Sequence, residues 1–327
     1  MPKTQFFSRR AIGTALLAIA AGPALCLSAA AQSWPTKPVK IVVNFPPGGA
    51  ADQIARAIGI PLAESLGQPV VVDNKPGAGQ SIAVDYVAKA APDGYTFLLI
   101  YNDLVILPAV RNNLPYKFDE MTYLIRPFAV APVVFVGPNV KAPTMQEFVA
   151  QMKANPGKTR YGSGGVGGLM HLMEAQFESA VGVKGVHVPY GGAAPVYQDM
   201  LGGTLEYTIA TPPNPEGLRV LASLGTKRHP LYPNVPTLEE MGIKGATLDV
   251  AAGFVAPPKM PKELADRLIA ELKAVFRDPE AIQKYQTAAK YTPDLNAPAG
   301  DDYKKLSVAE HLKWKAVVER EKIVVQQ

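Results

Sequence analysis

Short apolar runs and amphipathic stretches alternate along the chain. The runs 39–45, 70–72 and 96–100 are rich in β-branched or apolar residues and predict strands. Residues 52–66 carry an apolar residue at every fourth position and predict a helix, and residues 82–90 predict a second one. This alternation is typical of an α/β protein with an open parallel sheet.

A longer apolar run, 128–136, contains prolines and could carry the chain into a second domain. Thr144 and Glu147 have the spacing of a capping box and predict a helix over residues 144–152. The segment 247–255 is interpreted as an extended return crossing. We further expect helices at 169–180 and ending near residue 201, strands at 206–210 and 219–223, and helices from Pro261, Pro279 and Asp301.

The junction between the first strand and the first helix is rich in proline and glycine. Pro46 and Pro47 restrict the backbone, whereas Gly48 and Gly49 let a ligand approach without a Cβ in the way. A helix start presents unpaired N–H groups and the positive end of its dipole, which Asp52 would complement. These residues fit an anion site and a well-capped βα turn equally well.

The order of strand, glycine loop and helix recurs three more times, in loops 74–80, 160–168 and 189–194. In an open parallel sheet, ligands bind outside the carboxyl ends of the strands. Loops 45–51, 76–80 and 101–103 are therefore expected to form one wall of a cleft. For Asp103 we favour a capping role over contact with the ligand.

The first 31 residues have the pattern of an export signal. Lys3, Arg9 and Arg10 form a basic segment, residues 11–27 are apolar and uncharged, and small residues precede a cleavage site after Ala31. General secretion is the default route, and the paired arginines only faintly suggest the twin-arginine route. A membrane anchor is the weaker interpretation, because a cleavage site follows the apolar run.

Composition narrows the function further. The chain has 33 Lys+Arg and 28 Asp+Glu, and the signal holds three of the basic residues, so 30 face 28 and the mature net charge is about +2. This near-neutral balance gives no support for binding nucleic acid. Cys26, the only cysteine, lies in the signal, so no disulfide or thiolate metal site is expected. The remaining length suggests about two domains.

Two enzyme interpretations are weak. Gly162, Gly164 and Gly167 have the spacing of a dinucleotide fingerprint, but no acid follows at the distance that would hold a ribose, so no cofactor is expected. Ser163 could be a hydrolase nucleophile, but Tyr161 stands where a nucleophile elbow has glycine, and His171 is too close in sequence to be a convincing base.

The histidines show no zinc-ligand spacing, and each is expected to be structural rather than catalytic. Among them His171 is of most interest, because it lies in the first turn of a helix whose start faces the expected cleft. What remains is a set of preorganised backbone donors at several helix starts. This predicts an exported receptor for a small anion, without a metal.

Six motifs in matching order then resemble one known family, the Bug family of periplasmic solute-binding proteins of tripartite tricarboxylate transporters. The resemblance covers the chain from about Trp34 to its C-terminus. The motifs are FPPGG at 45–49, NKPGAG at 74–79, APDGYT at 91–96, HVPY at 187–190, LGG at 201–203 and PNVPT at 233–237.

The resemblance implies an α/β protein with the type II periplasmic-binding-protein fold. Two α/β domains, residues 32–130 plus 250–327 and residues 131–249, would be joined by two crossing segments with a ligand cleft between them. Backbone groups of the first glycine loop would hold a ligand carboxylate. The implied binding residues are Phe45, Pro47, Gly48, Gly49, Ala50, Ala51, Gly77, Gly79, Tyr101, Asn102, Ser163, Gly164, Gly167, His171, Tyr190, Gly191, Gly192, Ala193 and Thr211.

Departures from the family pattern bear on the ligand. Ala210 stands where many relatives have Asp, and Ala251 lies where they have a bulky residue. The first change removes a partner for an α-ammonium group, and the second could enlarge the pocket. We therefore expect a carboxylate that is not an amino acid, either larger than usual or aromatic.

The family resemblance implies hinge closure on a small carboxylate and transient contact with membrane permease subunits, by a monomer. One alternative keeps the fold but gives the protein a signalling role, presenting bound ligand to a membrane sensor. The other alternative, an exported hydrolase using Ser163, lacks a base in the sequence.

Overall fold

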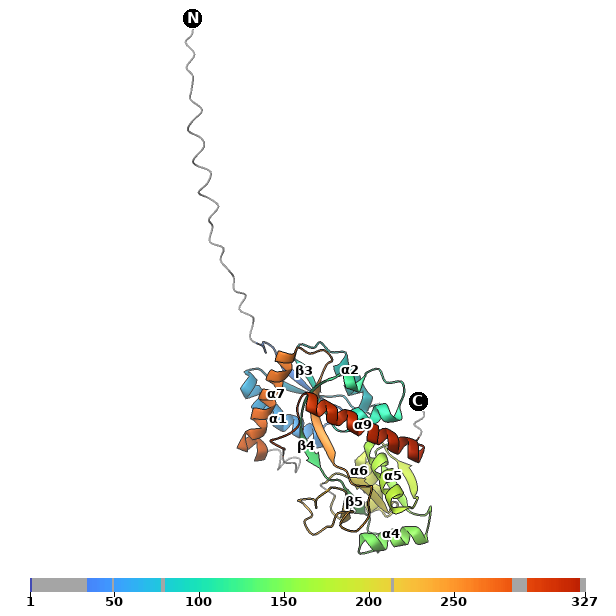
Figure 1. Cartoon of the computed structure of the whole chain (residues 1–327). Coiled ribbons are helices and arrows are strands. Elements are labelled where there is room, and N and C mark those ends of the chain that lie inside the picture. Colours follow the sequence, from blue (N-terminus) through green and yellow to red (C-terminus); the bar gives the residue numbers. More distant parts are fainter. Residues whose placement is uncertain (2–33, 49, 78–79, 213–214, 284–292, 324–327) are drawn as a thin grey trace.

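The computed structural model describes residue 1 and residues 34–48, 50–77, 80–212, 215–283 and 293–323. These residues form two five-stranded sheets, each with helices packed on it, and Figure 1 shows them as two lobes. The first sheet has the order β2-β1-β3-β10-β4. Its strands are β1 (Val39–Val43), β2 (Val70–Asn74), β3 (Thr96–Ile100), β4 (Thr122–Val130) and β10 (Val250–Ala256).

The second sheet has the order β7-β6-β8-β5-β9. Its strands are β5 (Val133–Val136), β6 (Arg160–Ser163), β7 (Val186–Pro189), β8 (Tyr207–Ala210) and β9 (Arg219–Ser223). The chain enters this sheet between β4 and β5 and returns to the first sheet between β9 and β10. The strands therefore divide between two sheets that the chain links twice.

The directions of the strands determine which loops lie on the side where the chain passes from one sheet to the other. In the first sheet β1, β2 and β3 are parallel, and β10 is antiparallel to β3 and to β4. Consequently β4, whose end leads into the second sheet, finishes at the same edge as β1, β2 and β3. In the second sheet β5 is antiparallel to β8 and β9, and β6 is parallel to β7 and β8. The carboxyl ends of β6, β7 and β8 thus lie on the side where the chain enters β5.

Helices cover both faces of the first sheet. On one face α1 (Ala50–Leu66) and α7 (Lys262–Arg277) pack on each other and on the sheet, around Phe97, Phe128 and Phe254. On the other face lie α2 (Ser81–Ala88), α3 (Asp103–Val110) and α9 (Asp301–Glu321). In the second lobe, α5 (Leu169–Val181) and α6 (Ala193–Leu201) pack on the sheet, and α4 (Met145–Ala154) completes the lobe.

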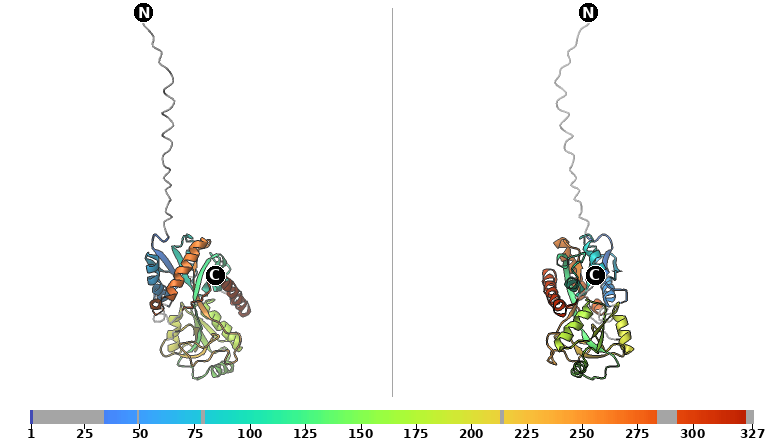
Figure 2. Two further views of the ribbon diagram at one scale, coloured as in Figure 1. Left: turned by 60° about the vertical axis from the view of Figure 1, so that its left-hand side comes forward. Right: turned by 90° about the vertical axis from the view of Figure 1, so that its right-hand side faces the viewer.

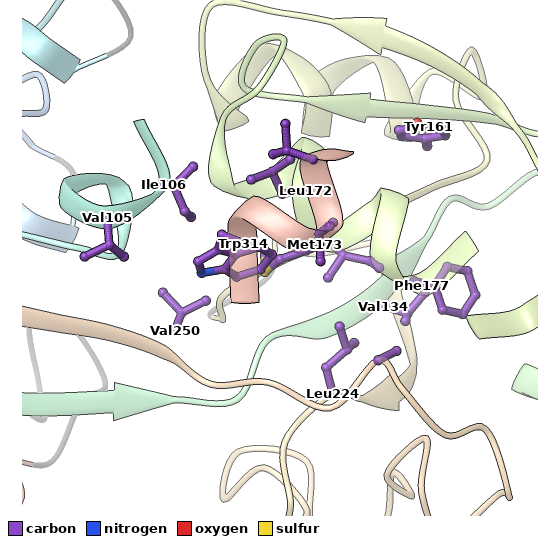
Figure 3. Close-up of a cluster of buried hydrophobic side chains, with 14 of the residues drawn as sticks. Val105, Ile106, Val134, Tyr161, Leu172, Met173, Phe177, Leu224, Val250 and Trp314 are labelled. Atoms are coloured by element: carbon purple, nitrogen blue, oxygen red, sulfur yellow. The ribbon is translucent and has the colours of Figure 1, made fainter. Parts of the chain in front are cut away.

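Helix α9 contacts both lobes. It packs on α3 and β4 of the first lobe and on α5 of the second, and Figures 1 and 2 show it running along the side of the molecule. Trp314 of α9 is buried near Ile106 of α3 and Leu172 and Met173 of α5 (Figure 3). One hydrophobic cluster therefore continues from the first lobe into the second.

Most predicted elements are confirmed, with shifted ends. The helix expected from residue 52 begins at Ala50, and the apolar run 128–136 divides into the end of β4 and all of β5. Thr144 caps α4, since its Oγ1 accepts a hydrogen bond from Glu147 N at 3.2 Å. The helix expected from Pro279 is present over residues 279–283, and the positions that follow lie outside the described residues. None of the described helices is both long enough and apolar enough to span a membrane.

Candidate functional site

The β1–α1 junction is held rigid by its own side chains. The backbone N–H of Gly48 donates to Asp52 Oδ2 at 2.9 Å, and Arg56 forms an ion pair with Asp52 at 2.9 Å. Burial opposes ionisation of Asp52, but Arg56 and the Gly48 N–H hold its pKa below the ordinary value. Gly48 has φ +88°, which favours glycine. This loop is therefore preorganised.

Other predicted binding residues of the first lobe lie in or beside this junction. Asn74 Nδ2 donates to the Phe45 carbonyl at 3.0 Å and ties the first loop to the second. Gly77 has φ +119°, and a Cβ there would lie 2.8 Å from Ile82. Pro47 is exposed, Ala51 is buried in the first turn of α1, and Ala50 begins that helix. The predicted binding residues Gly49 and Gly79 lie outside the described residues.

Tyr101 and Asn102 both follow β3, but their side chains differ in how far they are free to contact a ligand. Tyr101 is half-buried, and its ring meets Phe45 edge-on with centroids 5.7 Å apart. Asn102 is buried, its Nδ2 donates to Glu310 at 3.2 Å, and its Oδ1 accepts from Ala251 N at 2.7 Å. The amide predicted to contact the ligand is thus engaged in tying this loop to β10 and α9.

Ser163 lies at the end of β6 in the second lobe and is fully buried. Its Oγ accepts from Gly165 N at 3.2 Å, lies 3.1 Å from Gly165 O, and is 2.6 Å from His187 Nε2. Gly167 N donates to His171 Nδ1 at 3.0 Å. The N–H groups of Gly165 and Gly167 therefore shape the loop itself, whereas Gly164 approaches Gly192 of the neighbouring loop.

The structure corrects the view that Ser163 lacks a histidine partner. That partner is His187 on the adjacent strand β7, where Ser163 itself pairs with Pro189 in the ladder. His171 instead stacks on His187, with ring centroids 3.9 Å apart. Burial lowers the pKa of both histidines to about 4, so both are neutral at pH 7. With its hydroxyl fully buried, Ser163 is not presented to a substrate.

The β7–α6 loop is the more open part of lobe two. Tyr190 donates its hydroxyl to Asp199 at 2.5 Å, which fixes the ring against α6. Apart from their chain neighbours, no described atom lies within 4 Å of a Cβ built at Gly191 or Gly192, and Ala193 begins α6. Thr211 follows β8 and is half-buried, while Ala210 and Ala251 are both buried.

Sequence reasoning did not identify two buried acids behind these loops. In lobe two, Glu174 Oε1 accepts hydrogen bonds from Thr208 Oγ1 at 2.8 Å and from Ile209 N at 3.1 Å, and burial raises the pKa of Glu174. In lobe one, Asp103, for which a capping role was predicted, lies in the first turn of α3 after the N-cap residue Asn102 and is buried, and burial raises its pKa to about 7. Their raised pKa values depend on burial, which a helical spacing alone does not reveal.

Together the loops present helix starts from both lobes on the crossing side. The first turns of α1, α5 and α6 each carry backbone N–H groups without an intrahelical partner, and the positive dipole end lies there. Within the described ranges, no group of three or more His, Cys, Asp or Glu side chains could hold a metal ion. The arrangement is that of a two-lobed binding protein with neutral, dipolar donors.

Comparison with known proteins agrees with the class of two-lobed binding proteins. Residues 54–323 match the model of the tripartite tricarboxylate transporter family receptor. A UPF0065 protein of Bordetella pertussis is 33% identical over 84% of this chain and 85% of its own. Protein BugT of the same organism is 31% identical over 88% of this chain and 90% of its own. The chain therefore belongs to the tripartite tricarboxylate transporter receptor family, with Bug proteins among its relatives.

Solved structures show the same fold. The periplasmic binding protein BugD aligns with a TM-score of 0.80 and 27% identity, covering 90% of this chain and 100% of that one. R. palustris Rpa4515, solved with adipate, aligns with a TM-score of 0.80 and 27% identity, covering 89% of this chain and 99% of that one. The predicted type II periplasmic-binding architecture, an α/β fold in two domains, is confirmed.

Proposed function

We propose that this protein binds a small carboxylate between its two lobes and delivers it to a membrane permease. The observation that carries the proposal is the set of helix starts, α1 from one lobe and α5 and α6 from the other, on the side where the chain crosses. Membership in a receptor family supports it, as does the adipate bound to the similar protein Rpa4515.

Backbone N–H groups would hold the carboxylate. The charged side chains nearest the first loops are already engaged, with Asp52 paired to Arg56 and Lys75 paired to Asp73 at 3.4 Å. A carboxylate at a helix start gains charge-assisted hydrogen bonds without needing a cationic side chain. The contacts proposed for this role come from the Phe45–Ala51 loop, Gly77 and Gly79, the Ser163–Gly167 loop and the Tyr190–Ala193 loop. In these loops the N–H groups of Gly48, Gly165 and Gly167 hold the loop shape, and the remaining N–H groups are the proposed donors.

Ligand discrimination is proposed to come from the side chains around these donors. Tyr101 and Thr211 are half-buried at the carboxyl ends of β3 and β8. With Ala210 and Ala251 buried and no acid at either position, an α-ammonium group would lack a partner. We therefore propose a carboxylate that is not an amino acid.

Closure of the lobes is proposed to bury the ligand. The moving bodies would be residues 32–130 plus 250–327 and residues 131–249, linked where the chain crosses within 128–136 and 247–255. Low dielectric between closed lobes strengthens each hydrogen bond to the carboxylate. We propose a monomer that acts in the periplasm after removal of residues 1–31, a segment that lies largely outside the described residues.

The first experiment is a thermal-shift screen of the mature protein, residues 32–327. The panel contains mono-, di- and tricarboxylates, aromatic acids and amino acids. A ligand at a hundred times its Kd should add about 2.7 kcal/mol of stability and raise Tm by a few degrees. No shift from any acid would contradict the proposal, and a shift with glutamate or aspartate at micromolar concentration would contradict the ligand class.

A deletion strain separates transport from the signalling alternative. Loss of uptake of the identified acid, with induction of its transporter intact, supports delivery to a permease. Loss of induction with intact uptake supports ligand presentation to a membrane sensor.

A further inference from the structure

Three loops of the first lobe are joined behind the proposed site by a chain of polar side chains, of which Asn44 and Asp103 are buried and Gln80 is half-buried. Asn44 follows β1, Gln80 precedes α2 and Asp103 opens α3. One terminal atom of the Gln80 carboxamide lies 2.7 and 2.8 Å from the two carboxylate oxygens of Asp103 and 3.1 Å from Asn44 Nδ2. Gln80 adopts φ +76°, a left-handed conformation that is uncommon outside glycine.

This chain has two complete hydrogen-bond arrangements. When Asp103 is ionised, Gln80 Nε2 donates to both of its oxygens. When Asp103 is protonated, its O–H donates to Gln80 Oε1, which also accepts from Asn44 Nδ2. Asn44 Oδ1 is buried and has no partner among the described residues, so Asn44 is able to turn with Gln80. The orientation of the loop side chains is therefore linked to one proton.

We propose that Asp103 positions the three ligand loops of the first lobe and couples carboxylate binding to the uptake of one proton. This inference rests on the proposed function. The buried carboxylate lies behind loops that would receive a second negative charge, and like charges in a low-dielectric interior repel strongly. Protonation of Asp103 removes that repulsion.

The electrostatic surroundings leave Asp103 able to titrate in the physiological range. Burial raises the pKa of Asp103 to about 7, although its own backbone N–H opposes this, and donation by Gln80 Nε2 in the ionised arrangement also favours the charged carboxylate. Tyr116 lies close enough to Asp103 to interact with it electrostatically, whereas Arg111 and Asp85 act on Tyr116, and Asp85 is paired with Lys89 at 2.8 Å. From α9, Glu310 reaches Asn102 and pairs with Arg126, and His311 contacts the Val105 carbonyl at 2.9 Å. No described contact places a cation directly on the Asp103 carboxylate.

The sign of the coupling follows from linkage. A bound anion raises the pKa of Asp103, so the complex holds more protons than the free protein. Affinity is then highest below the pKa of the free protein and falls as pH rises through it. Each unit by which binding raises this pKa lowers the affinity up to tenfold at high pH.

The test titrates adipate, succinate and benzoate into mature protein by calorimetry at several values from about pH 6 to about pH 8.5, a range that brackets the pKa of Asp103. For the wild type we expect an affinity about tenfold weaker at the upper end than at the lower, with proton uptake visible as a dependence of heat on buffer ionisation enthalpy. The isosteric Asp103→Asn variant should bind with the low-pH affinity throughout, without proton uptake. Asp85→Asn, the matched control on α2, should keep the wild-type pH profile.

The outcomes distinguish the two proposals. If one of these acids binds with the same affinity across the pH range and without proton uptake in the wild type, the coupling is overturned and the proposed function stands. The coupling is also overturned if Asp103→Asn retains the wild-type pH profile. If neither these three acids nor any acid of the thermal-shift panel binds at any pH, both proposals fail. Because proton uptake is measured on the wild type, the test does not depend on the variant folding.

Discussion

Asp52 stabilises the start of α1 by accepting from Gly48 N and pairing with Arg56. The sequence predicted its place in the first turn, because a carboxylate there complements the helix dipole. It did not predict that the amide of Asn102 would be engaged, since Glu310 and Ala251 are far from Asn102 along the chain. Nor did it pair Ser163 with His187, which requires the register of β6 on β7.

Replacing Asp52 tests the first of these contacts. Asp52→Asn should lower the free energy of unfolding by about 1 kcal/mol near pH 7. A hydrogen bond to a charged carboxylate is stronger by about this amount than the neutral hydrogen bond that the asparagine amide would make in its place. The folded-state pKa of Asp52 is depressed, so its contribution is present above the ordinary pKa of 3.8 and is lost as pH falls through the folded value. The difference between variant and wild type in urea unfolding should therefore shrink below about pH 4.

A matched pair on the surface provides the control. Lys262 and Asp266 are also spaced i,i+4, but both are exposed. Asp266→Asn should leave the unfolding midpoint unchanged. Equal losses in the two variants would contradict the structural role assigned to Asp52.

At the scale of elements, alternation of apolar runs and amphipathic stretches was sufficient to predict most strands and helices, although α3 and the first half of β4 were not predicted. Their periodicity depends only on local backbone geometry. The ends were less accurate, because caps such as Gly48 with Asp52 act across several residues. The division of 128–136 into β4 and β5 was not evident, since both halves are largely apolar although they belong to different sheets.

The β1–α1 junction can be tested through its glycine. Gly48→Ala should cost about 1–2 kcal/mol, because φ +88° is unfavourable for a residue with a Cβ. It should also weaken carboxylate binding, since relief of that strain moves the loop's N–H groups. Urea unfolding and calorimetric titration measure the two effects separately.

Gly242→Ala is the matched control for this substitution. Gly242 has φ +78° and, like Gly48, has no described atom within 4 Å of an added Cβ, but it lies on the segment between β9 and β10. The same loss of stability with unchanged affinity is expected. A loss of affinity equal to that of Gly48→Ala would mean that the first glycine loop has no special part in binding.

At the scale of the whole molecule, α9 joins the lobes on a side that the sequence did not suggest. The helix was expected to be a packing element, and its apolar residues were consistent with that. Its contact with α5 depends on how two separate sheets face each other, which no local pattern encodes. Trp314 is one of the α9 residues in the cluster that the lobes share (Figure 3).

Trp314→Ala should therefore lower the free energy of unfolding by about 3–5 kcal/mol, because it leaves a cavity in the shared cluster. Leu312→Ala, on the same helix but 61% exposed, should change it by less than about 0.5 kcal/mol. Chemical denaturation of both variants measures the difference. A small effect at Trp314 would show that the lobes do not share a core through α9.

The central claim is that a carboxylate group is held by dipolar donors between the lobes. Its most direct test is a calorimetric titration of the mature protein with the best acid of the thermal-shift panel and, in parallel, with the methyl ester of that acid. The acid should bind at least about a hundredfold more tightly, because helix starts and charge-assisted hydrogen bonds favour the anion. Equal affinity for acid and ester would contradict the account.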